Sequence, residues 1–316
     1  GDNLTLSFVS DEALMTPSGE LAGRLGLSGV DNSSATDWYF TTEVLPATPE
    51  DNVSFRFDIS DLAGNVVTGF NSTLNNSSVR VDKTPPLVSG ITLVSTNDNG
   101  SWAKAGDNLT LQFSTDEAVS TPSILIAANS RLADNRSLDG KQWETIYEVL
   151  PGDNGTVNWD FTVRDLAGNV SDNVTQDNAS LITMDTSVPV VSGVTFVSNN
   201  FKNTNYAKAG DDLIVSFKTN EALKDTSVIL NNPDNQSLSP TFTGYTNGGD
   251  LDWEAVFRVD SDTLKWTINS STFFVGYEIS ATDYAGNVAI DDLGVIEPFR
   301  QIIVDIIDPV IAQVPL

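Results

Sequence analysis

Short segments in which apolar and polar residues alternate recur along the whole chain. Alternation with a period of two is typical of β-strands that bury one face, and no long stretch shows a helical period. The clearest segments are 4–8, 53–59, 109–113, 157–163, 213–217 and 275–281. A further strand is expected around each of three tryptophans, Trp38, Trp143 and Trp253. The pattern predicts an all-β chain.

The sequence also repeats itself three times, which is the mark of a tandem array. The copies share a Gly-Asp-rich strand start at Gly1, Gly106 and Gly210, an Asp-x-Ala-Gly-Asn loop at 61–65, 165–169 and 283–287, and the three tryptophans. About seven short strands per hundred residues, separated by turn signals, are typical of a Greek-key sandwich. We therefore predict tandem immunoglobulin-like Greek-key β-sandwiches.

Proline marks the exits of the repeats, because it cannot pair within a central strand. The expected modules are 1–86, which lacks its first strand, 87–188, and 189–309, which is enlarged by insertions before Trp253 and around Thr263 to Phe274. Residues 310–316 are expected to begin a further strand or module. The junctions contain no Gly/Ser run, so the modules should form a semi-rigid rod. The terminal segment either belongs to a longer array or completes the first sandwich of another copy.

The charge of the chain is strongly negative. Asp and Glu number 43 against 16 Lys and Arg, which gives a net charge of −27. This disfavours nucleic acid and anionic membrane surfaces as partners and favours cations. The chain has no Cys and no His, which excludes disulfides, thiolate or imidazole metal sites, and Ser-His-Asp or Cys-His catalysis. No apolar stretch is long enough to span a bilayer. We expect no enzymatic activity.

Acidic residues recur at three places in each repeat, and oxygen ligands point to a hard cation such as Ca²⁺. One loop cannot supply six to eight oxygens, but loops at one end of a sandwich cluster, so the three sets should meet at a module boundary. The alternative is that the Asp-x-Ala-Gly-Asn segments only form turns. The candidate ligands are Asp11, Glu12, Asp61, Asn65, Asp82, Asp116, Glu117, Asp165, Asn169, Asp185, Glu221, Asp283, Asn287 and Asp305.

More than half of the asparagines stand in Asn-x-Ser/Thr, more than the composition alone would produce. The excess predicts a glycosylated outer surface, and the alternative is an Asn-, Ser- and Thr-rich β surface without sugar. The candidate acceptors are Asn3, Asn32, Asn52, Asn71, Asn99, Asn108, Asn135, Asn154, Asn169, Asn173, Asn235 and Asn269. The three repeated tryptophans are expected to fill the cores, the alternative being platforms for a glycan.

The second repeat runs from Ala105-Gly106-Asp107-Asn108 through Asp116-Glu117-Ala118 and the loop at 165–169 to Met184-Asp185-Thr186 and Pro189. This pattern resembles the tandem Ig-like repeats of microbial cell-surface proteins, which occur in surface-layer (S-layer) proteins and giant adhesins. The resemblance covers nearly the whole chain and implies a structural role, often with bound Ca²⁺. The third repeat departs from it with Asn220 in place of an acid, which puts a cation site using that position in doubt.

Three functions follow from the resemblance and the composition. The first is an acidic, glycosylated S-layer lattice subunit with cations between modules, the second is the Ca²⁺-stiffened stalk of an adhesin, and the third is a carbohydrate-binding accessory array. The expected partners are neighbouring copies or further modules of the same polypeptide, cations and surface glycans. The expected location is extracellular, at the S-layer or cell envelope.

Overall fold

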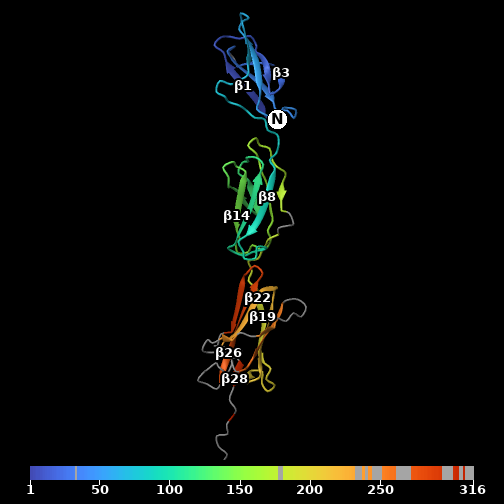
Figure 1. Cartoon of the computed structure of the whole chain (residues 1–316), viewed down its shortest axis with the longest axis vertical. Helices are drawn as coiled ribbons and strands as arrows, with labels where there is room; N and C mark the ends of the chain where they lie inside the picture. Colours follow the sequence, from blue (N-terminus) through green and yellow to red (C-terminus); the bar gives the residue numbers. More distant parts are fainter. Residues whose placement is uncertain are drawn as a thin grey trace, which may run out of the picture.

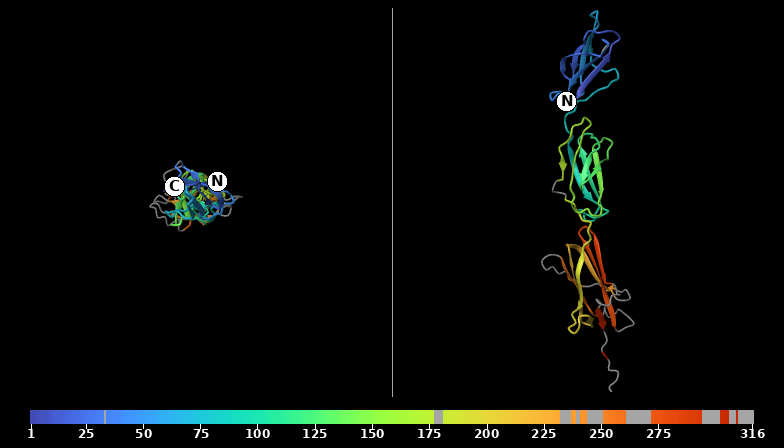
Figure 2. Two further views of the ribbon diagram at one scale, coloured as in Figure 1. Left: turned by 90° about the horizontal axis from the view of Figure 1, so that it is seen from above. Right: turned by 180° about the vertical axis from the view of Figure 1, so that it is seen from behind.

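The structure is a computed structural model that describes residues 1–32, 34–176, 181–231, 237–238, 241–243, 251–260, 272–293, 302–305 and 309. Every regular element in these residues is a β-strand. Three sandwiches follow one another along a single axis (Figure 1), and the view along that axis shows them superimposed (Figure 2). The prediction of tandem Ig-like sandwiches in a rod is confirmed. Within the described residues, no helix is long and apolar enough to cross a membrane.

Module 1 consists of two small antiparallel sheets. One has the order β1-β5-β4 and the other β3-β2-β6-β7. The strands are β1 (Asn3–Val9), β2 (Ser18–Leu21), β3 (Arg24–Ser28), β4 (Val30–Asp31), β5 (Asp37–Glu43), β6 (Phe55–Ser60) and β7 (Val66–Phe70).

Module 2 has a sheet β13-β14-β10-β8 facing a sheet β12-β11-β16-β17, with a small sheet β15-β18-β9 beside them. Neighbouring strands that are not consecutive in sequence, such as β8 beside β10 and β11 beside β16, give the sandwich its crossed connections. The strands are β8 (Val88–Ser95), β9 (Trp102–Ala103), β10 (Asn108–Thr115), β11 (Ser123–Ile126), β12 (Asn129–Leu132), β13 (Asp134–Asn135), β14 (Gln142–Glu148), β15 (Gly155–Thr156), β16 (Trp159–Thr162), β17 (Val174–Thr175) and β18 (Thr183–Met184).

Module 3 repeats this plan with a sheet β19-β21-β25-β24 and a larger sheet β20-β28-β26-β22-β23, in which β27 also pairs with β26. The strands are β19 (Val191–Ser198), β20 (Tyr206–Ala207), β21 (Asp212–Thr219), β22 (Leu223–Asn231), β23 (Ser237–Leu238), β24 (Thr241–Thr243), β25 (Asp252–Arg258), β26 (Thr272–Asp283), β27 (Val288–Leu293) and β28 (Ile302–Asp305). The insertions expected before Trp253 and around Thr263 to Phe274 are described only in part, because 232–236, 239–240, 244–250 and 261–271 lie outside the described residues, as does the segment 310–316.

The alternating apolar residues form the cores. In module 2, Leu111 of β10 is fully buried, and the ring of Phe113 lies 4.4 Å from that of Phe161 on the opposite sheet. Trp38 and Trp143 are buried, and Trp253 packs against the core of module 3. The prediction that these tryptophans fill the cores is confirmed, so they do not offer exposed platforms for a glycan.

Candidate cation sites at the module junctions

A glutamate follows the Gly-Asp-rich strand of each module and is held by a local hydroxyl. Thr115 Oγ1 donates to the backbone oxygen of Glu117 at 2.6 Å, and Thr219 Oγ1 donates to that of Glu221 at 2.8 Å. Ser10 makes the equivalent bond in module 1. These short-range bonds are the turns that Ser and Thr favour after a strand. They place the glutamate at the same point of each sandwich end.

The Asp-x-Ala-Gly-Asn loop is a turn built around its aspartate. Asp165 Oδ1 accepts from the backbone N–H groups of Gly168 at 2.6 Å and Asn169 at 2.8 Å. The other oxygen, Oδ2, accepts from Asn169 Nδ2 at 2.7 Å. Gly168 has φ of 102°, a conformation that a side chain would strain. Asp61 and Asp283 accept backbone and side-chain bonds in the same way from Asn65 and Asn287. The loop therefore forms the turn that its residue types predict.

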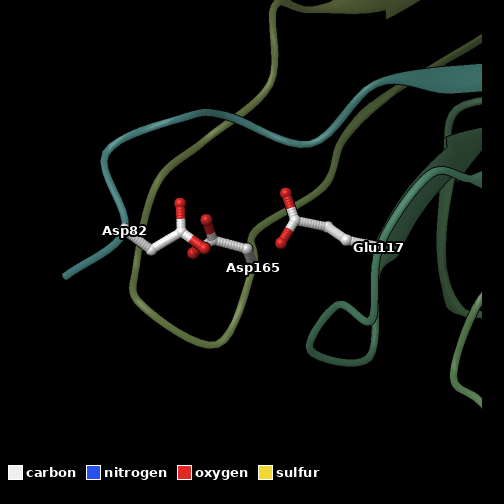
Figure 3. Close-up of side chains that lie close together, drawn as sticks. All are labelled: Asp82, Glu117 and Asp165. Atoms are coloured by element: carbon white, nitrogen blue, oxygen red, sulfur yellow. The ribbon is translucent and has the colours of Figure 1, made fainter. Parts of the chain in front are cut away.

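The loop aspartate and the strand glutamate meet the exit aspartate of the preceding module. Carboxylate oxygens of Asp82, Glu117 and Asp165 lie within 4.8 Å of one another. Figure 3 shows that they come from three separate segments and point toward one small volume. Asp185, Glu221 and Asp283 form the same arrangement at the next boundary. Each cluster combines one acid from one module with two from the next.

The loop asparagines connect the modules. Asn169 Nδ2 donates to the backbone oxygen of Asp82 at 3.2 Å, and Asn287 Nδ2 donates to that of Asp185 at 2.9 Å. These bonds hold the exit strand beside the aspartate of the loop. Asn169 and Asn287 therefore bridge the modules through their Nδ2 atoms, and the prediction that they also supply ligand oxygens stays a prediction.

Asp116 is also outside the cluster that it was expected to join. Its Oδ1 accepts from the backbone N–H of Leu87 at 2.8 Å, which holds the linker into β8. Asn220 Oδ1 accepts from Val190 N in the same way, at 2.6 Å. Either residue provides the required oxygen, so the change from acid to amide does not remove a carboxylate from the second cluster.

The remaining candidates lie at the ends of the array. Asp11, Glu12, Asp61 and Asn65 belong to module 1, and Asp305 ends β28 of module 3. Among the described residues, these acids do not form a third group of three. They stand, however, at the positions equivalent to the cluster residues of the two junctions.

The electrostatics of the clusters follow from their like charges. Burial raises the pKa of Glu117, and the charges of Asp82 and Asp165 raise it further, while Arg80 opposes them. Burial likewise raises the pKa of Glu221, together with the charges of Asp185 and Asp283. Burial also acts to raise the pKa of Asp165, but the bonds it accepts from Asn169 and the loop backbone outweigh burial and lower this pKa below its usual value. In each cluster the glutamate is thus the carboxylate whose charged form is least favoured.

The geometry of the carboxylates fits a calcium ion. Ca²⁺ binds oxygen at about 2.3–2.6 Å, so two ligands on opposite sides of one ion lie up to about 5 Å apart. The 4.8 Å limit within each cluster falls inside this range. Three carboxylates would supply part of the coordination shell, and water would supply the rest.

The two junctions differ in their basic neighbours. A cavity of about 410 Å³ at the first junction is lined by Arg80 and Lys141 together with Asp82 and Glu117. Lys141 Nζ donates to the backbone oxygen of Asp116 at 2.6 Å. At the second junction, the charges that act on Glu221 all come from acids. The second cluster is therefore the stronger candidate for a cation.

The second junction also has a direct contact between modules that sequence reasoning did not find. The ring of Tyr284 in the loop of module 3 stacks on Trp102 of module 2, with centroids 6.1 Å apart. Lys104 Nζ donates to the backbone oxygen of Gly286 at 2.8 Å, and Asn97 Nδ2 donates to that of Ala285 at 2.8 Å. The departure of Tyr284 from the Leu of the other loops was the available signal. These contacts restrict bending between modules 2 and 3.

These features define the chain as an array of Ig-like sandwiches joined by acidic junctions. No known sequence family and no curated protein matches the chain. Among solved structures, it is similar to the I9–I11 tandem of titin, with 10% identity, 91% of each chain covered and a TM-score of 0.29. A marsupial T cell receptor matches with 12% identity, 92% of this chain and 95% of the receptor chain covered, and a TM-score of 0.35. A Corynebacterium diphtheriae protein described as membrane anchored matches with 10% identity, 100% of this chain and 88% of the other chain covered, and a TM-score of 0.26. At these scores the likeness carries no functional argument.

Proposed function

We propose that the chain is a structural segment of an extracellular cell-surface protein, a non-catalytic rod whose module junctions bind Ca²⁺. The observation that carries this proposal is the recurrence of the same three-carboxylate cluster at both junctions. A cluster that only formed turns would not need an acid from the preceding module.

The expected effect of the cation is mechanical. Each cluster has one carboxylate on the exit strand of one module and two on the end loops of the next. Without a cation these groups repel one another, and the net charge of −27 adds to the repulsion along the rod. A bound Ca²⁺ reverses the sign of the interaction and ties the two modules together. Ca²⁺ is therefore expected to stiffen the rod and to stabilise its modules.

The proposal is tested by titrating the 316-residue chain with calcium. Calorimetry measures binding, and small-angle scattering measures the stiffness of the rod. We expect saturable binding and a narrower distribution of module orientations in Ca²⁺ than in chelator. The variant Glu221→Gln should weaken binding, whereas Glu12→Gln, at the matched position of module 1, should leave the junction sites intact in dilute protein. Identical scattering and identical melting in Ca²⁺ and in chelator would refute the cation role.

Within this class, we propose an S-layer lattice subunit, with an adhesin stalk as the alternative. Ordered sheets of the intact surface protein in divalent cation would support the lattice, and extended monomers would support the stalk. The carbohydrate-binding alternative depended on exposed tryptophans, and Trp38 and Trp143 are buried. The buried tryptophans therefore do not support this alternative.

Glycosylation remains part of the proposal and is tested by intact-mass analysis of the protein from its native source. Asn169 is removed from the acceptor set for a physical reason. Its Nδ2 donates to both Asp165 and the backbone oxygen of Asp82. A glycan on that nitrogen would leave one hydrogen for these two bonds. Asn235 and Asn269 lie outside the described residues.

A further inference from the structure

Module 2 carries a groove of about 420 Å³ that contains none of the cluster acids. It lies between the turn that joins β11 to β12, the loop before β15 and the start of β16. Its volume is within the range of about 300–1,000 Å³ that is usual for small-molecule pockets. The groove therefore has room for a small ligand.

Asn154 lines this groove and begins an Asn-x-Thr sequon with Thr156. Its Oδ1 accepts from the backbone N–H of Thr186 at 2.9 Å, which holds the exit segment of the module. Its Nδ2 donates at 3.4 Å to the backbone oxygen of Gly152, another residue of the groove. Since an amide nitrogen has two hydrogens, a glycosylated Asn154 keeps the one that this bond uses. The structure therefore permits a sugar on Asn154, in contrast to Asn169.

The corresponding residue of module 1 shows that the amide nitrogen is not needed to hold the exit segment. Glu50 Oε1 accepts from the backbone N–H of Lys83 at 3.1 Å, so a carboxylate makes the same bond there. Lys83 and Thr186 each follow the exit aspartate of their module. An acceptor oxygen is thus enough for the structural task, and the nitrogen of Asn154 is available for another.

The turn beside the groove is strained. Ala127 and Ala128 have φ of 48° and 60°, a region that residues other than glycine adopt at a cost. The same turn in module 1 has Ala22 and Gly23, so glycine serves at its second position. Both alanines of module 2 line the groove. Ala128 thus retains a methyl group, against the local strain, in a turn that borders the groove.

The side chains of the groove favour a neutral ligand with both hydroxyl groups and an apolar face. Asp153 and Asp160 line the groove, and carboxylates accept from hydroxyl groups and repel anions. Leu125, which is 42% exposed, borders the same space and offers apolar contact together with the two alanines. A neutral sugar ring matches both kinds of surface.

We propose that this groove holds the first sugar of an N-linked glycan on Asn154. A ligand tethered beside its site by a short link has an effective concentration of about millimolar, so even a weakly binding groove is filled. A free sugar lacks this advantage, which is why the occupant is the chain's own glycan. The inference rests on the glycosylation in the proposed function and names an acceptor whose sugar the fold receives.

The test is enzymatic release of N-glycans from the folded 316-residue chain, produced in a secretory host that glycosylates such sequons. Mass spectrometry of glycopeptides gives the release rate at each acceptor. Asn135 is the internal reference, because it is exposed on the edge strand β13. We expect release at Asn154 to be about tenfold slower than at Asn135, the protection that a contact of about 1.4 kcal/mol provides. The two rates should become equal once the chain is denatured.

Variants of the groove show whether it causes the protection. Leu125→Ser combined with Ala128→Gly removes apolar surface from the groove, keeps the sequon and should abolish the difference in rate. Ala128→Gly alone, which relieves the strain of the turn, should reduce it. Leu132→Ser is the matched control, because Leu132 lies on the same hairpin, is 70% exposed and does not line the groove. It should leave the difference unchanged.

The outcomes separate this inference from the proposed glycosylation. Sugar at other sequons with Asn154 unmodified overturns the inference and leaves glycosylation intact. Equal release rates in the folded chain, or a difference that the groove variants do not change, overturn it in the same way. Absence of sugar from every sequon refutes the glycosylation itself and, with it, the occupant of the groove.

Discussion

The variant Glu221→Gln removes one negative charge from the second junction while keeping the shape of the side chain. The carboxylate oxygens of Glu221, Asp185 and Asp283 lie within 4.8 Å of one another. At about this distance two unit charges repel by about 0.9 kcal/mol in bulk water and by about 3.5 kcal/mol at an effective dielectric constant of 20. Glu221 and Asp185 are partly exposed, so the lower figure applies more closely. Removing two such repulsions amounts to about 2 kcal/mol.

In chelator, Glu221→Gln is therefore expected to stabilise module 3. For a domain of about a hundred residues, about 2 kcal/mol raises Tm by roughly 8 °C or more. In Ca²⁺ the order should reverse, because an ion that binds only the folded state adds about 2.7 kcal/mol at a hundredfold excess over Kd. The wild-type chain gains this contribution, and the variant, which lacks one ligand, gains less.

The assay is differential scanning calorimetry of dilute wild-type and variant chains, each in chelator and in excess Ca²⁺. Glu12→Gln is the control, because Ser10 holds that glutamate in the same turn. Its Tm should change by less than that of Glu221→Gln in both conditions. A lower Tm of Glu221→Gln in chelator would refute the repulsion, and an equal gain of both chains in Ca²⁺ would refute the role of Glu221 as a ligand.

Four further predictions concern the junctions and the core. Acidification in chelator should raise Tm from neutral pH down to about pH 4.5, because burial and neighbouring acids raise the pKa of Glu221 in the folded state. The folded chain then binds a proton more tightly than the unfolded chain does. This added stability is lost as pH rises through the raised pKa. Calcium affinity, measured by calorimetric titration, should fall over the same acid range. Trp102→Ala should remove the stacking on Tyr284 and broaden the angle between modules 2 and 3 in small-angle scattering without unfolding either module. Phe113→Ala should destabilise module 2 by about 3–5 kcal/mol in denaturant melts, since the ring is 1% exposed, whereas an effect below about 1 kcal/mol would contradict its placement in the core.

The strands and turns could be predicted from the sequence because they depend on residues that lie close together in it. The period-two alternation around Leu111 and Phe113 predicted strands with one buried face, and the repeated landmarks predicted three sandwiches. The turn around Asp165 followed from the preference of Asp, Gly and Asn for such loops. The hydroxyl bond of Thr115 to Glu117 is likewise local.

The partners of these acids were decided by tertiary structure. The repeated acids identified Asp82, Asp116 and Glu117 equally as candidates, but only Asp82 and Glu117 joined the cluster with Asp165. Asp116 instead holds the linker at Leu87, a role that Asn220 fills equally well at Val190.

What the sequence determined by itself was the module and its turns, since strand alternation and loop hydrogen bonds act within a few residues. What only the tertiary structure decided was which carboxylates share a site. Asp82 and Asp165 are brought together by the packing of one sandwich end against the exit strand of another. The stacking of Tyr284 on Trp102 arises in the same way, between residues far apart in the chain. Such contacts depend on the relative placement of whole modules, which no local pattern encodes.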